Sequence, residues 1–353
     1  MDEPLKVTVA VCNYNGAEHL PPCLEALLAQ TYAIDELLVV DNASTDASEA
    51  VVRERAPNAT WVPLGVNEGP CPARNAGLER ARNEWVLLVD NDAVLEPDVL
   101  AKLVAAARAR PDAVLLQPRS VFADDPDVVH YDGGRFHYAG LFSLRNFSVP
   151  IAEAEGRGTV DVDGAVSVVL LARRSVLLEL GAFDGDYFIL FEDLDLSYRL
   201  RLAGHAILSV EDALVLHRGG TGGISFRGAI LYPRRRAFFH SRNRWIYLTK
   251  CYAWRTLLVA APGLLVYELV WLAFTLRSGT FGGWWEGKRD FFAKLPGVRA
   301  RRRAIQGSRR RRDRELLVGG PLTLSAQLRG GLAERTLNGL LRAWWTLVRP
   351  LAG

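Results

Sequence analysis

The sequence predicts an α/β fold in which helices cover both faces of a mostly parallel central sheet, followed by a helical, membrane-associating C-terminal region. Short apolar runs alternate with amphipathic runs between residues 7 and 117, a pattern typical of parallel sheets. Polar clusters follow three of the apolar runs, where ligands bind in such sheets. Beyond residue 245 the chain becomes rich in tryptophan, arginine and long apolar stretches.

The expected elements follow in order along the chain. Strands are expected at Val7–Val11, Glu36–Val40, Thr60–Val62, Trp85–Val89 and Ala113–Gln117, and helices at Leu20–Gln30, Ser48–Arg55, Ala73–Arg82 and Ala101–Arg108. Residues 119–158 are rich in Gly, Asp and aromatic residues and are expected to be mainly loops. Regular structure is expected again at Val160–Ala172 and Ser175–Leu180. A helix is then expected to begin at the acidic segment FEDLDLSYRL and to end at Gly204.

The length of 353 residues exceeds the usual size of one compact core. We therefore expect one large domain at 1–245, made of halves 1–117 and 118–245, and a helical region at 246–353. The net charge is only +3, but Glu286–Arg314 holds twelve Lys and Arg against three Asp and Glu. A basic tail on a mildly acidic body indicates an anionic partner for the tail.

The N-terminus shows no basic segment followed by an apolar run, so no signal peptide is expected. The four cysteines are scattered without paired spacing, which suits a reducing compartment. The body is therefore expected in the cytoplasm.

The segment Thr256–Leu276 is apolar and long enough to cross a bilayer, but it contains Pro262, Gly263 and Glu268. These residues favour an interfacial helix or a re-entrant helical hairpin over a simple spanning helix. Six of the nine tryptophans lie in this tail, beside arginine clusters at Arg299–Arg303 and Arg309–Arg314. Such a composition predicts docking to an anionic membrane surface, although a solvated basic face or nucleic-acid binding is the alternative for arginine runs.

The segment WVLLVDNDA is the strongest local signal of chemistry. An apolar strand leads into Asp90 and Asp92, and the two-residue period of extended chain can point both carboxylates the same way. Paired carboxylates suit Mg²⁺ or Mn²⁺ on a diphosphate. Taken alone, the triplet fits a turn after a strand equally well.

A third metal ligand is expected from His217 in LVLHRGG. Its neutral imidazole would join the two carboxylates and tilt the preference toward Mn²⁺, whereas a lone histidine is more often structural. Glu192, Asp193 and Asp195 begin the acidic helix. Helix capping explains any one of them, and an ionised carboxylate there can instead accept a proton from an attacking hydroxyl.

Two further segments carry candidate nucleotide contacts. Arg74, in NEGPCPARNAG, is expected in a first helical turn where it can hold a pyrophosphate; the alternative is an ordinary surface arginine. In DNASTD, Asp41 can hold a nucleobase, or Ser44 or Asp46 can simply cap the next helix.

Taken in order, VAVCNYN, LLVVDNASTD, NEGPCPARNAG, LLVDNDA, GAFDGDYFILFEDLDLSYRL and LHRGG resemble glycosyltransferase family 2 over about residues 5–245, especially its rhamnosyltransferase-like and galactofuranosyltransferase-like branches. The resemblance implies the Rossmann-like GT-A fold, nucleotide-diphosphate sugar donors and inversion at the anomeric carbon. It gives Asp193 the role of catalytic base. It also assigns Asp90, Asp92 and His217 to the metal and Tyr14, Asp41, Arg74, Asp90, Asn91, Gly164 and Glu192 to the nucleotide sugar. Asn91 departs from the family's usual Asp, and Cys12 stands where many members have Thr or Ser.

The predicted function is therefore metal-dependent, inverting sugar transfer. The donor would be dTDP-rhamnose or a UDP-hexose, and the acceptor a hydroxyl of a lipid-linked or cell-envelope glycan. The cofactor would be Mn²⁺ or Mg²⁺, and no nucleic acid is expected as a partner. The location would be the cytoplasmic face of the cell membrane, peripheral or re-entrant. The alternative is a catalytically inactive nucleotide-sugar-binding scaffold at the membrane. A dinucleotide oxidoreductase is disfavoured because CNYNGAEHL lacks the expected glycine pattern.

Overall fold

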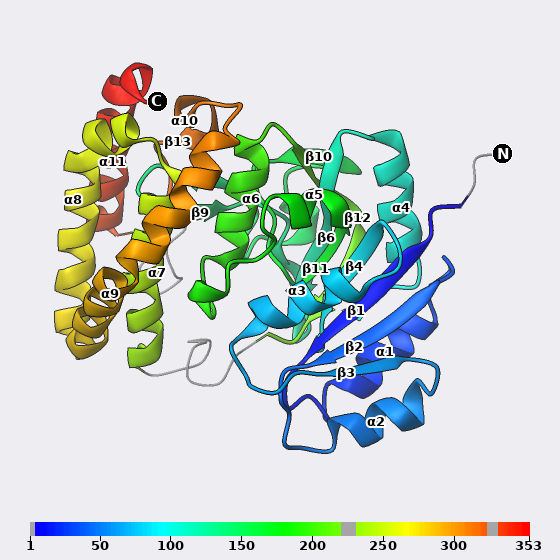
Figure 1. The fold of residues 1–353 in the computed structure, drawn as a ribbon. Helices are drawn as coiled ribbons and strands as arrows, with labels where there is room; N and C mark the ends of the chain where they lie inside the picture. Colours follow the sequence, from blue (N-terminus) through cyan, green and yellow to red (C-terminus); the bar gives the residue numbers. More distant parts are fainter. Residues whose placement is uncertain (1–3, 220–230, 323–330) are drawn as a thin grey trace. The chain divides into compact units, whose positions relative to one another are not determined.

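The computed structural model describes residues 4–219, 231–322 and 331–353 (Figure 1). The chain divides into two compact units. Unit 1 comprises residues 1–133, 145–196 and 205–219, and unit 2 comprises residues 134–144, 197–204 and 220–353. These units differ from the expected domains 1–245 and 246–353, whose boundary stays a prediction.

Unit 1 is built on a ten-stranded mixed sheet whose principal order is β10-β12-β6-β11-β4-β1-β2-β3. Strands β4, β1, β2 and β3 are parallel, as are β12 and β6, whereas β11 runs antiparallel between β4 and β6. The strands are β1 (Val7–Asn13), β2 (Glu36–Asp41), β3 (Thr60–Pro63), β4 (Trp85–Asp90), β5 (Ala93–Leu95), β6 (Ala113–Phe122), β7 (Asp125–Tyr131), β10 (Thr159–Val162), β11 (Val169–Arg173) and β12 (Ala206–His217).

Helices lie on both faces of this sheet, as the sequence pattern predicts. The helices of unit 1 are α1 (Leu20–Leu28), α2 (Ser48–Arg55), α3 (Pro70–Arg80), α4 (Val99–Ala109) and α5 (Arg174–Glu179). Val9 and Val11 of β1 belong to one buried cluster with α1, α2 and α4. On the opposite face, Gly77 lets α3 approach the sheet, since an added Cβ would lie 2.8 Å from the Cβ of Ala10. Successive β1 residues alternate between these two faces because the strand is extended.

The expectation of loops between residues 119 and 158 is wrong in large part. Strand β6 continues to Phe122, and the chain then forms β7, β8 (Gly134–His137), β9 (Leu141–Leu144) and a short 3₁₀ helix, η1 (Ile151–Glu153). Strand β7 opens with three exposed residues, Asp125–Asp127, which include a proline. Such a segment carries loop-like composition because its exposed end has no buried face to fill with apolar residues.

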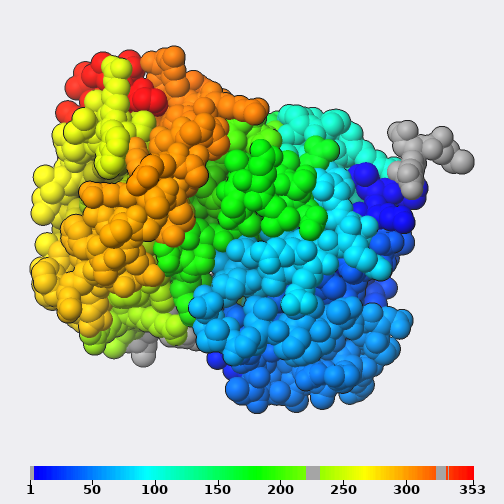
Figure 2. All heavy atoms as spheres, viewed as in Figure 1, coloured from blue at the N-terminus to red at the C-terminus, as the bar shows by residue number. Residues whose placement is uncertain are grey.

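Helix α6 (Glu192–Leu202) begins in unit 1 and ends in unit 2, and Gly204 follows it with a positive φ of 96°. Unit 2 otherwise contains α7 (Arg234–Cys251), α8 (Trp254–Arg277), α9 (Phe281–Gly307), α10 (Asp313–Leu316) and α11 (Leu332–Val348). It also contains a small sheet of β8, β9 and β13 (Leu317–Val318), and the 3₁₀ helix η4 (Arg349–Leu351). In the space-filling view, α8 and α9 (yellow and orange) lie at the surface of this unit (Figure 2).

Helix α8 runs unbroken from Trp254 to Arg277, with Pro262 inside it, so this segment is one helix and not a hairpin. By length and composition it is the one helix among the described residues that could cross a membrane. Gly263 faces inward: an added Cβ would lie 2.1 Å from the Oη atom of Tyr138. Gly263 therefore allows a close approach between the helix and a buried aromatic ring.

Two members of the arginine clusters stabilise unit 2 from within. Arg302 is buried, and its Nη1 donates to the carbonyl oxygens of Thr249 and Tyr252 at 2.5 and 2.6 Å. These carbonyls belong to the C-terminal end of α7, where a helix leaves acceptors without intrahelical partners. Arg309 donates to the buried carboxylate of Asp313 at 2.6 Å. The clusters are therefore not uniformly solvated.

Candidate active site and metal centre

The first part of the site is the turn that follows β4. Strand β4 ends at Asp90, which pairs with Cys12 of β1, and Asn91 and Asp92 form a turn before β5 begins at Ala93. Asp92 is therefore not a strand residue, and the two-residue period does not orient it. The tight turn brings its carboxylate back toward Asp90.

His217 completes the cluster through strand pairing. It is the last residue of β12, where it lies opposite Ala93 of β5 in an antiparallel register. This pairing brings its Nε2 to 3.3 Å from Oδ2 of Asp92. One candidate ligand atom from each of Asp90, Asp92 and His217 lies within 4.8 Å of the others. The structure thus brings together all three predicted metal ligands.

The donor set suits a divalent cation. Two carboxylates and one imidazole match the ligand preferences of Mn²⁺, and the carboxylates also suit Mg²⁺. The exposed fractions of the side chains are 26% for Asp90, 20% for Asp92 and 12% for His217, so the cluster is held by the fold yet open to an ion.

The environments of the two acids differ. Burial raises the pKa of Asp90, against the opposing charge of Arg74. Burial also pushes the pKa of Asp92 upward, but its hydrogen bond to His217 and the charge of that imidazole hold it below the ordinary value. Asp92 is therefore ionised at neutral pH, as a metal ligand must be.

His130 is a site residue that the sequence did not reveal. It is buried in β7, and its Nδ1 lies 3.0 Å from Nδ1 of His217. The two rings stack with centroids 5.0 Å apart. An imidazole that binds a metal through Nε2 carries its proton on Nδ1 and is oriented by an acceptor there. His130 occupies that position, and only the pairing of β6 with β7 brings it there.

Arg74 is buried rather than at the surface, so the alternative of an ordinary surface arginine is wrong. It lies on α3, and its Nη2 donates to Oδ1 of Asp90 at 2.7 Å and to the carbonyl of Ser167 at 2.9 Å. Its Nη1 lies 3.7 Å from Oε1 of Glu192 and donates no hydrogen bond within the described residues. Arg74 therefore connects the metal cluster to α6 and keeps one donor uncommitted.

Asp193 lies in the first turn of α6, beside Glu192. Its carboxylate accepts a hydrogen bond from the backbone N–H of Leu194 at 2.8 Å. Because Arg74 contacts both Asp90 and Glu192, the residue that precedes Asp193, the expected base lies in the neighbourhood of the metal cluster. Burial raises the pKa of Asp193. Burial, and then the charge of Asp193, raise the pKa of Glu192. One of these carboxyls is thus suited to hold a proton near neutral pH.

The loops after β1 and β2 are tied to each other and to the turn after β4. The Asn13 amide donates to Oδ1 of Asp41 at 2.8 Å and accepts from the Asn91 amide at 2.7 Å. Asp41 is buried and also accepts the backbone N–H of Ser44 at 2.9 Å, whereas Tyr14 is 49% exposed at the loop surface. Asn91 therefore positions loops and does not belong to the metal cluster. Asn13 is a second residue that the sequence did not indicate.

The helix-capping alternative in DNASTD holds for Asp46. Its Oδ1 accepts the backbone N–H of Ser48, the first residue of α2, at 3.0 Å. Its Oδ2 accepts the backbone N–H of Ala17 at 2.9 Å, which secures the loop after β1. The nucleobase contacts of Tyr14 and Asp41 stay predictions.

Two glycines border the site. Gly69 precedes α3 with a positive φ of 90°, and a Cβ there would lie 2.3 Å from the carbonyl oxygen of Phe188. Only glycine fits this close approach of two loops. Gly164 is buried in the segment between β10 and β11, three residues before Ser167. Its contact with a donor sugar stays a prediction.

A mixed sheet with acidic ligands at the ends of its strands and helices on both faces is the architecture of GT-A-type glycosyltransferases. The chain superposes on GalNAc-T7, solved with UDP, GalNAc and Mn²⁺, with a TM-score of 0.57 at 15% identity, over 75% of this chain and 52% of that chain. It superposes on residues 1–349 of S. aureus TarS, solved with UDP-GlcNAc, with a TM-score of 0.54 at 17% identity, over 86% and 87% of the two chains. These likenesses establish the GT-A-like fold.

Residues 8–162 match the model of glycosyl transferase family 2, and they form a domain of that family. Succinoglycan biosynthesis protein ExoO of Rhizobium meliloti is 36% identical over 154 residues, which cover 42% of this chain and 42% of that protein. An N-acetylglucosaminyl-diphospho-decaprenol L-rhamnosyltransferase of Mycobacterium tuberculosis is 29% identical over 235 residues, 59% of this chain and 75% of that protein. The match thus spans less than half the length of the first relative.

Proposed function

We propose that this protein transfers a sugar from a nucleotide-diphosphate donor to a hydroxyl of a lipid-linked or cell-envelope glycan, with inversion at the anomeric carbon and with help from a divalent metal. One observation carries the proposal: Arg74 joins the Asp90–Asp92–His217 cluster to the first turn of α6, where Asp193 lies. The GT-A-like neighbours solved with UDP and Mn²⁺ or with UDP-GlcNAc are consistent with such a donor.

Asp90, Asp92 and His217 would hold the ion, Mn²⁺ or Mg²⁺. When bound, the ion neutralises negative charge that develops on the departing nucleoside diphosphate. Arg74 supports the same task from the protein side: its guanidinium is buried next to Asp90, and its uncommitted Nη1 can donate to a phosphate oxygen. Fixed charges in a site sheltered from water stabilise such a transition state by several kcal/mol (about 3).

Asp193 would act as the base. Its carboxylate takes the proton of the acceptor hydroxyl while that oxygen forms a bond to the anomeric carbon. On the opposite side, the bond from the anomeric carbon to the diphosphate oxygen breaks, and its electron pair leaves with the nucleoside diphosphate. One displacement inverts the configuration. The raised pKa of Asp193 brings the base closer to the working pH, which favours proton transfer.

The donor and acceptor are proposed from the relatives. The rhamnosyltransferase relative is named for a diphospho-decaprenol acceptor, and ExoO is named for succinoglycan biosynthesis. We therefore propose dTDP-rhamnose or a UDP-hexose as the donor and an envelope glycan, lipid-linked in its precursor form, as the acceptor. We propose the cytoplasmic face of the cell membrane as the location, where such donors and lipid-linked acceptors would meet.

The test measures release of UDP or dTDP from a panel of nucleotide sugars, with and without Mn²⁺, for the wild type and two variants. Asp193→Asn keeps the shape of the side chain but cannot take a proton, so release should fall by about 10²–10⁴-fold while donor binding persists. Asp125→Asn, which alters an exposed carboxylate on β7, is the matched control and should leave release unchanged.

Three results would count against the proposal. Near-normal turnover by Asp193→Asn would remove that residue from the role of base. Activity that survives a strong chelator would remove the metal. Tight donor binding without product under every acceptor tested would favour the alternative, an inactive nucleotide-sugar-binding scaffold.

A further inference from the structure

Helix α8 has two faces of different character. The inner face carries buried glycine, threonine and aromatic side chains that contact other parts of unit 2. Gly263 packs on Tyr138, Trp271 donates from Nε1 to Oγ of Ser241 at 2.8 Å, and Thr256 is buried. This face is packed against the remainder of unit 2.

The outer face is an uninterrupted apolar stripe, which we call the α8 stripe. Its leucines recur at spacings of seven, four and seven residues, which keeps them on one side of a helix. Their exposed fractions are high: 75% for Leu258, 59% for Leu265, 56% for Leu269 and 58% for Leu276. Trp254, Val266 and Val270 extend the same exposed surface. At 1.5 Å per residue the stripe is about 33 Å long from Trp254 to Leu276, and a contiguous exposed apolar patch of this kind marks a site of protein or membrane interaction.

Glu268 is the one acidic residue of α8, and it does not interrupt the stripe. Its carboxylate turns inward and accepts hydrogen bonds from Nη1 of Arg244 at 2.9 Å and from Nε1 of Trp245 and Trp284 at 3.0 and 2.9 Å. Nζ of Lys288 lies 2.6 Å from the same group. A helix that crossed a bilayer alone would have to leave these four partners and carry an unpaired carboxylate into lipid, at high cost. The contacts favour a helix that stays on the protein.

Basic residues strongly outnumber acidic residues in this part of the chain. Residues 231–353 contain 24 Lys and Arg against six Asp and Glu. Arg255 and Arg277 stand at the two ends of the α8 stripe, and both are exposed. Basic side chains next to exposed apolar and tryptophan side chains match a bilayer surface, where acyl chains lie just below phosphate groups.

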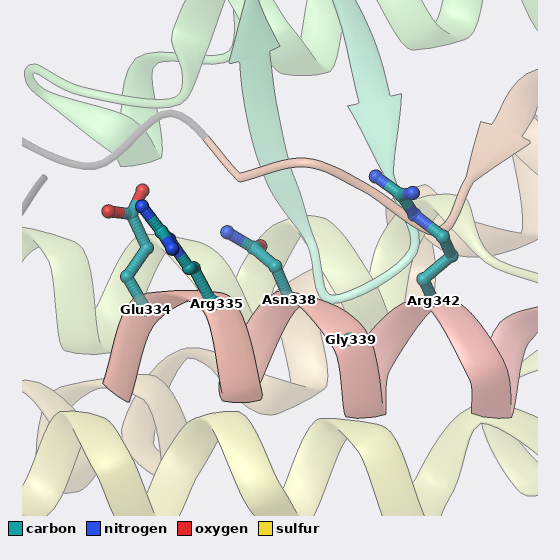
Figure 3. Close-up of a pocket in the computed structure, with 5 residues that line it drawn as sticks. All are labelled: Glu334, Arg335, Asn338, Gly339 and Arg342. Atoms are coloured by element: carbon teal, nitrogen blue, oxygen red, sulfur yellow. The ribbon is translucent and has the colours of Figure 1, made fainter. Parts of the chain in front are cut away.

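Helix α11 packs beside α8, with Nε1 of Trp344 donating to the carbonyl of Val259 at 3.1 Å. It exposes Leu340 and Leu347, at 59% and 70%. A hollow of about 380 Å³ runs along another side of this helix, lined by Glu334, Arg335, Asn338, Gly339 and Arg342 (Figure 3). The helix thus presents its exposed leucines and its guanidinium groups on nearly opposite sides, the distribution of a helix that lies in the plane of a membrane surface.

We infer that unit 2 docks on an anionic phospholipid bilayer through the α8 stripe, with α8 lying along the surface and not across the membrane. The leucines and Trp254 enter the acyl boundary, while Arg255 and Arg277 contact lipid phosphates. The basic charge of this region favours anionic lipid as the partner of the α8 stripe. A second copy of this chain would bring another strongly basic surface against the first, whereas anionic lipid is complementary in charge. The inference is independent of the proposed transfer reaction.

The test is co-sedimentation of the full chain with vesicles made of equal parts phosphatidylglycerol and phosphatidylcholine, compared with pure phosphatidylcholine. The variant Leu258→Gln/Leu265→Gln/Leu269→Gln changes only exposed side chains of the stripe. Each substitution should lower the partition coefficient about five-fold and the triple variant about 100-fold, since each withdraws an apolar side chain from lipid. Leu28→Gln, at a 58% exposed leucine of α1, is the matched control and should bind like the wild type.

Docking is supported if the wild type binds only the anionic vesicles, if high salt or alkaline carbonate releases it, and if the triple variant stays in solution with an unchanged melting temperature. Equal binding by the triple variant overturns the assignment of the stripe. Release by detergent alone overturns the surface orientation in favour of a spanning helix. Failure of the wild type to bind, with concentration-dependent dimers that the triple variant does not form, would make a second copy the occupant. Donor turnover by the triple variant in a vesicle-free assay is a separate measurement that reports on the proposed reaction.

Discussion

The contact between His130 and His217 allows the metal site to be tested without measuring catalysis. The two Nδ1 atoms are 3.0 Å apart, so only one of them can carry the proton they share. For Nε2 of His217 to offer its lone pair to an ion, Nδ1 of His217 must be the donor and His130 the acceptor. Replacing His130 by Phe keeps a stacked ring in β7 but removes the acceptor.

The expected loss follows from this geometry. In His130→Phe the imidazole of His217 either keeps its buried N–H without a partner, at about 1–3 kcal/mol, or moves the proton to Nε2, which then cannot bind a metal. Both outcomes oppose metal binding, and removal of such an orienting partner typically lowers affinity about 10–100-fold. At 25 °C this corresponds to about 1.4–2.7 kcal/mol.

Manganese binding can be followed by the electron paramagnetic resonance signal of free Mn²⁺, which disappears on coordination. His130→Asn is the informative companion, because its Oδ1 can stand where Nδ1 stood and accept the same proton; it should recover most of the affinity. The reasoning is refuted if His130→Phe binds Mn²⁺ as tightly as the wild type, or if His130→Asn is as weak as His130→Phe.

Three further predictions concern packing, the arginine clusters and pH. Gly263→Ala should lower the free energy of unfolding by about 1–3 kcal/mol because the added Cβ overlaps a buried ring. Gly339→Ala, which has open space around it, should raise that free energy by about 0.5–1 kcal/mol. Thermal unfolding of the two variants measures both changes. Arg302→Ala should destabilise by about 2 kcal/mol by freeing two buried carbonyls, whereas the exposed neighbour Arg303→Ala should change the melting temperature little. Burial raises the pKa of Asp193. The transfer rate should therefore fall as the pH is lowered, with a midpoint above the ordinary carboxyl pKa of about 3.9. The same sign means that ionisation of Asp193 opposes folding, so stability from this group is lost as pH rises; Asp193→Asn should raise the melting temperature at neutral pH while abolishing transfer.

The alternating elements between residues 7 and 117 were predictable because both signals, apolar periodicity and turn residues, agree there. Strands β7 to β9 were missed because their composition is that of loops, and β7 opens with exposed Asp and Pro. Antiparallel hairpins also lack the intervening helix whose sequence pattern makes parallel strands recognisable. The single helix α8 was misjudged for a different reason. Pro262 and Gly263 normally argue for a break, and the buried ring of Tyr138 explains why a glycine stands at position 263.

The residues of the site were predictable by type, and their geometry was not. Asp90 and Asp92 were expected to converge through the period of a strand, whereas a turn after β4 achieves it. His217 lies beside them because β12 pairs with β5, although the two strands are more than a hundred residues apart in the sequence. No local sequence pattern indicates this pairing. His130 lacked any motif, and Asn13, although it lies in VAVCNYN, was given no role. They act on other side chains, and such roles become visible only when the strands are assembled.

The position of Arg74 has a consequence for how kinetic data on this protein are interpreted. One guanidinium donates to the proposed metal ligand Asp90, donates to the backbone carbonyl of Ser167 and lies against Glu192, the neighbour of the proposed base. Truncating it would disturb ion coordination and helix docking along with any phosphate contact, so the measured loss would exceed the sum of separable effects and could not be apportioned among them. Replacement of Arg74 by lysine keeps the positive charge but loses the several fixed N–H donors of the guanidinium. This variant would distinguish electrostatic support from geometric restraint.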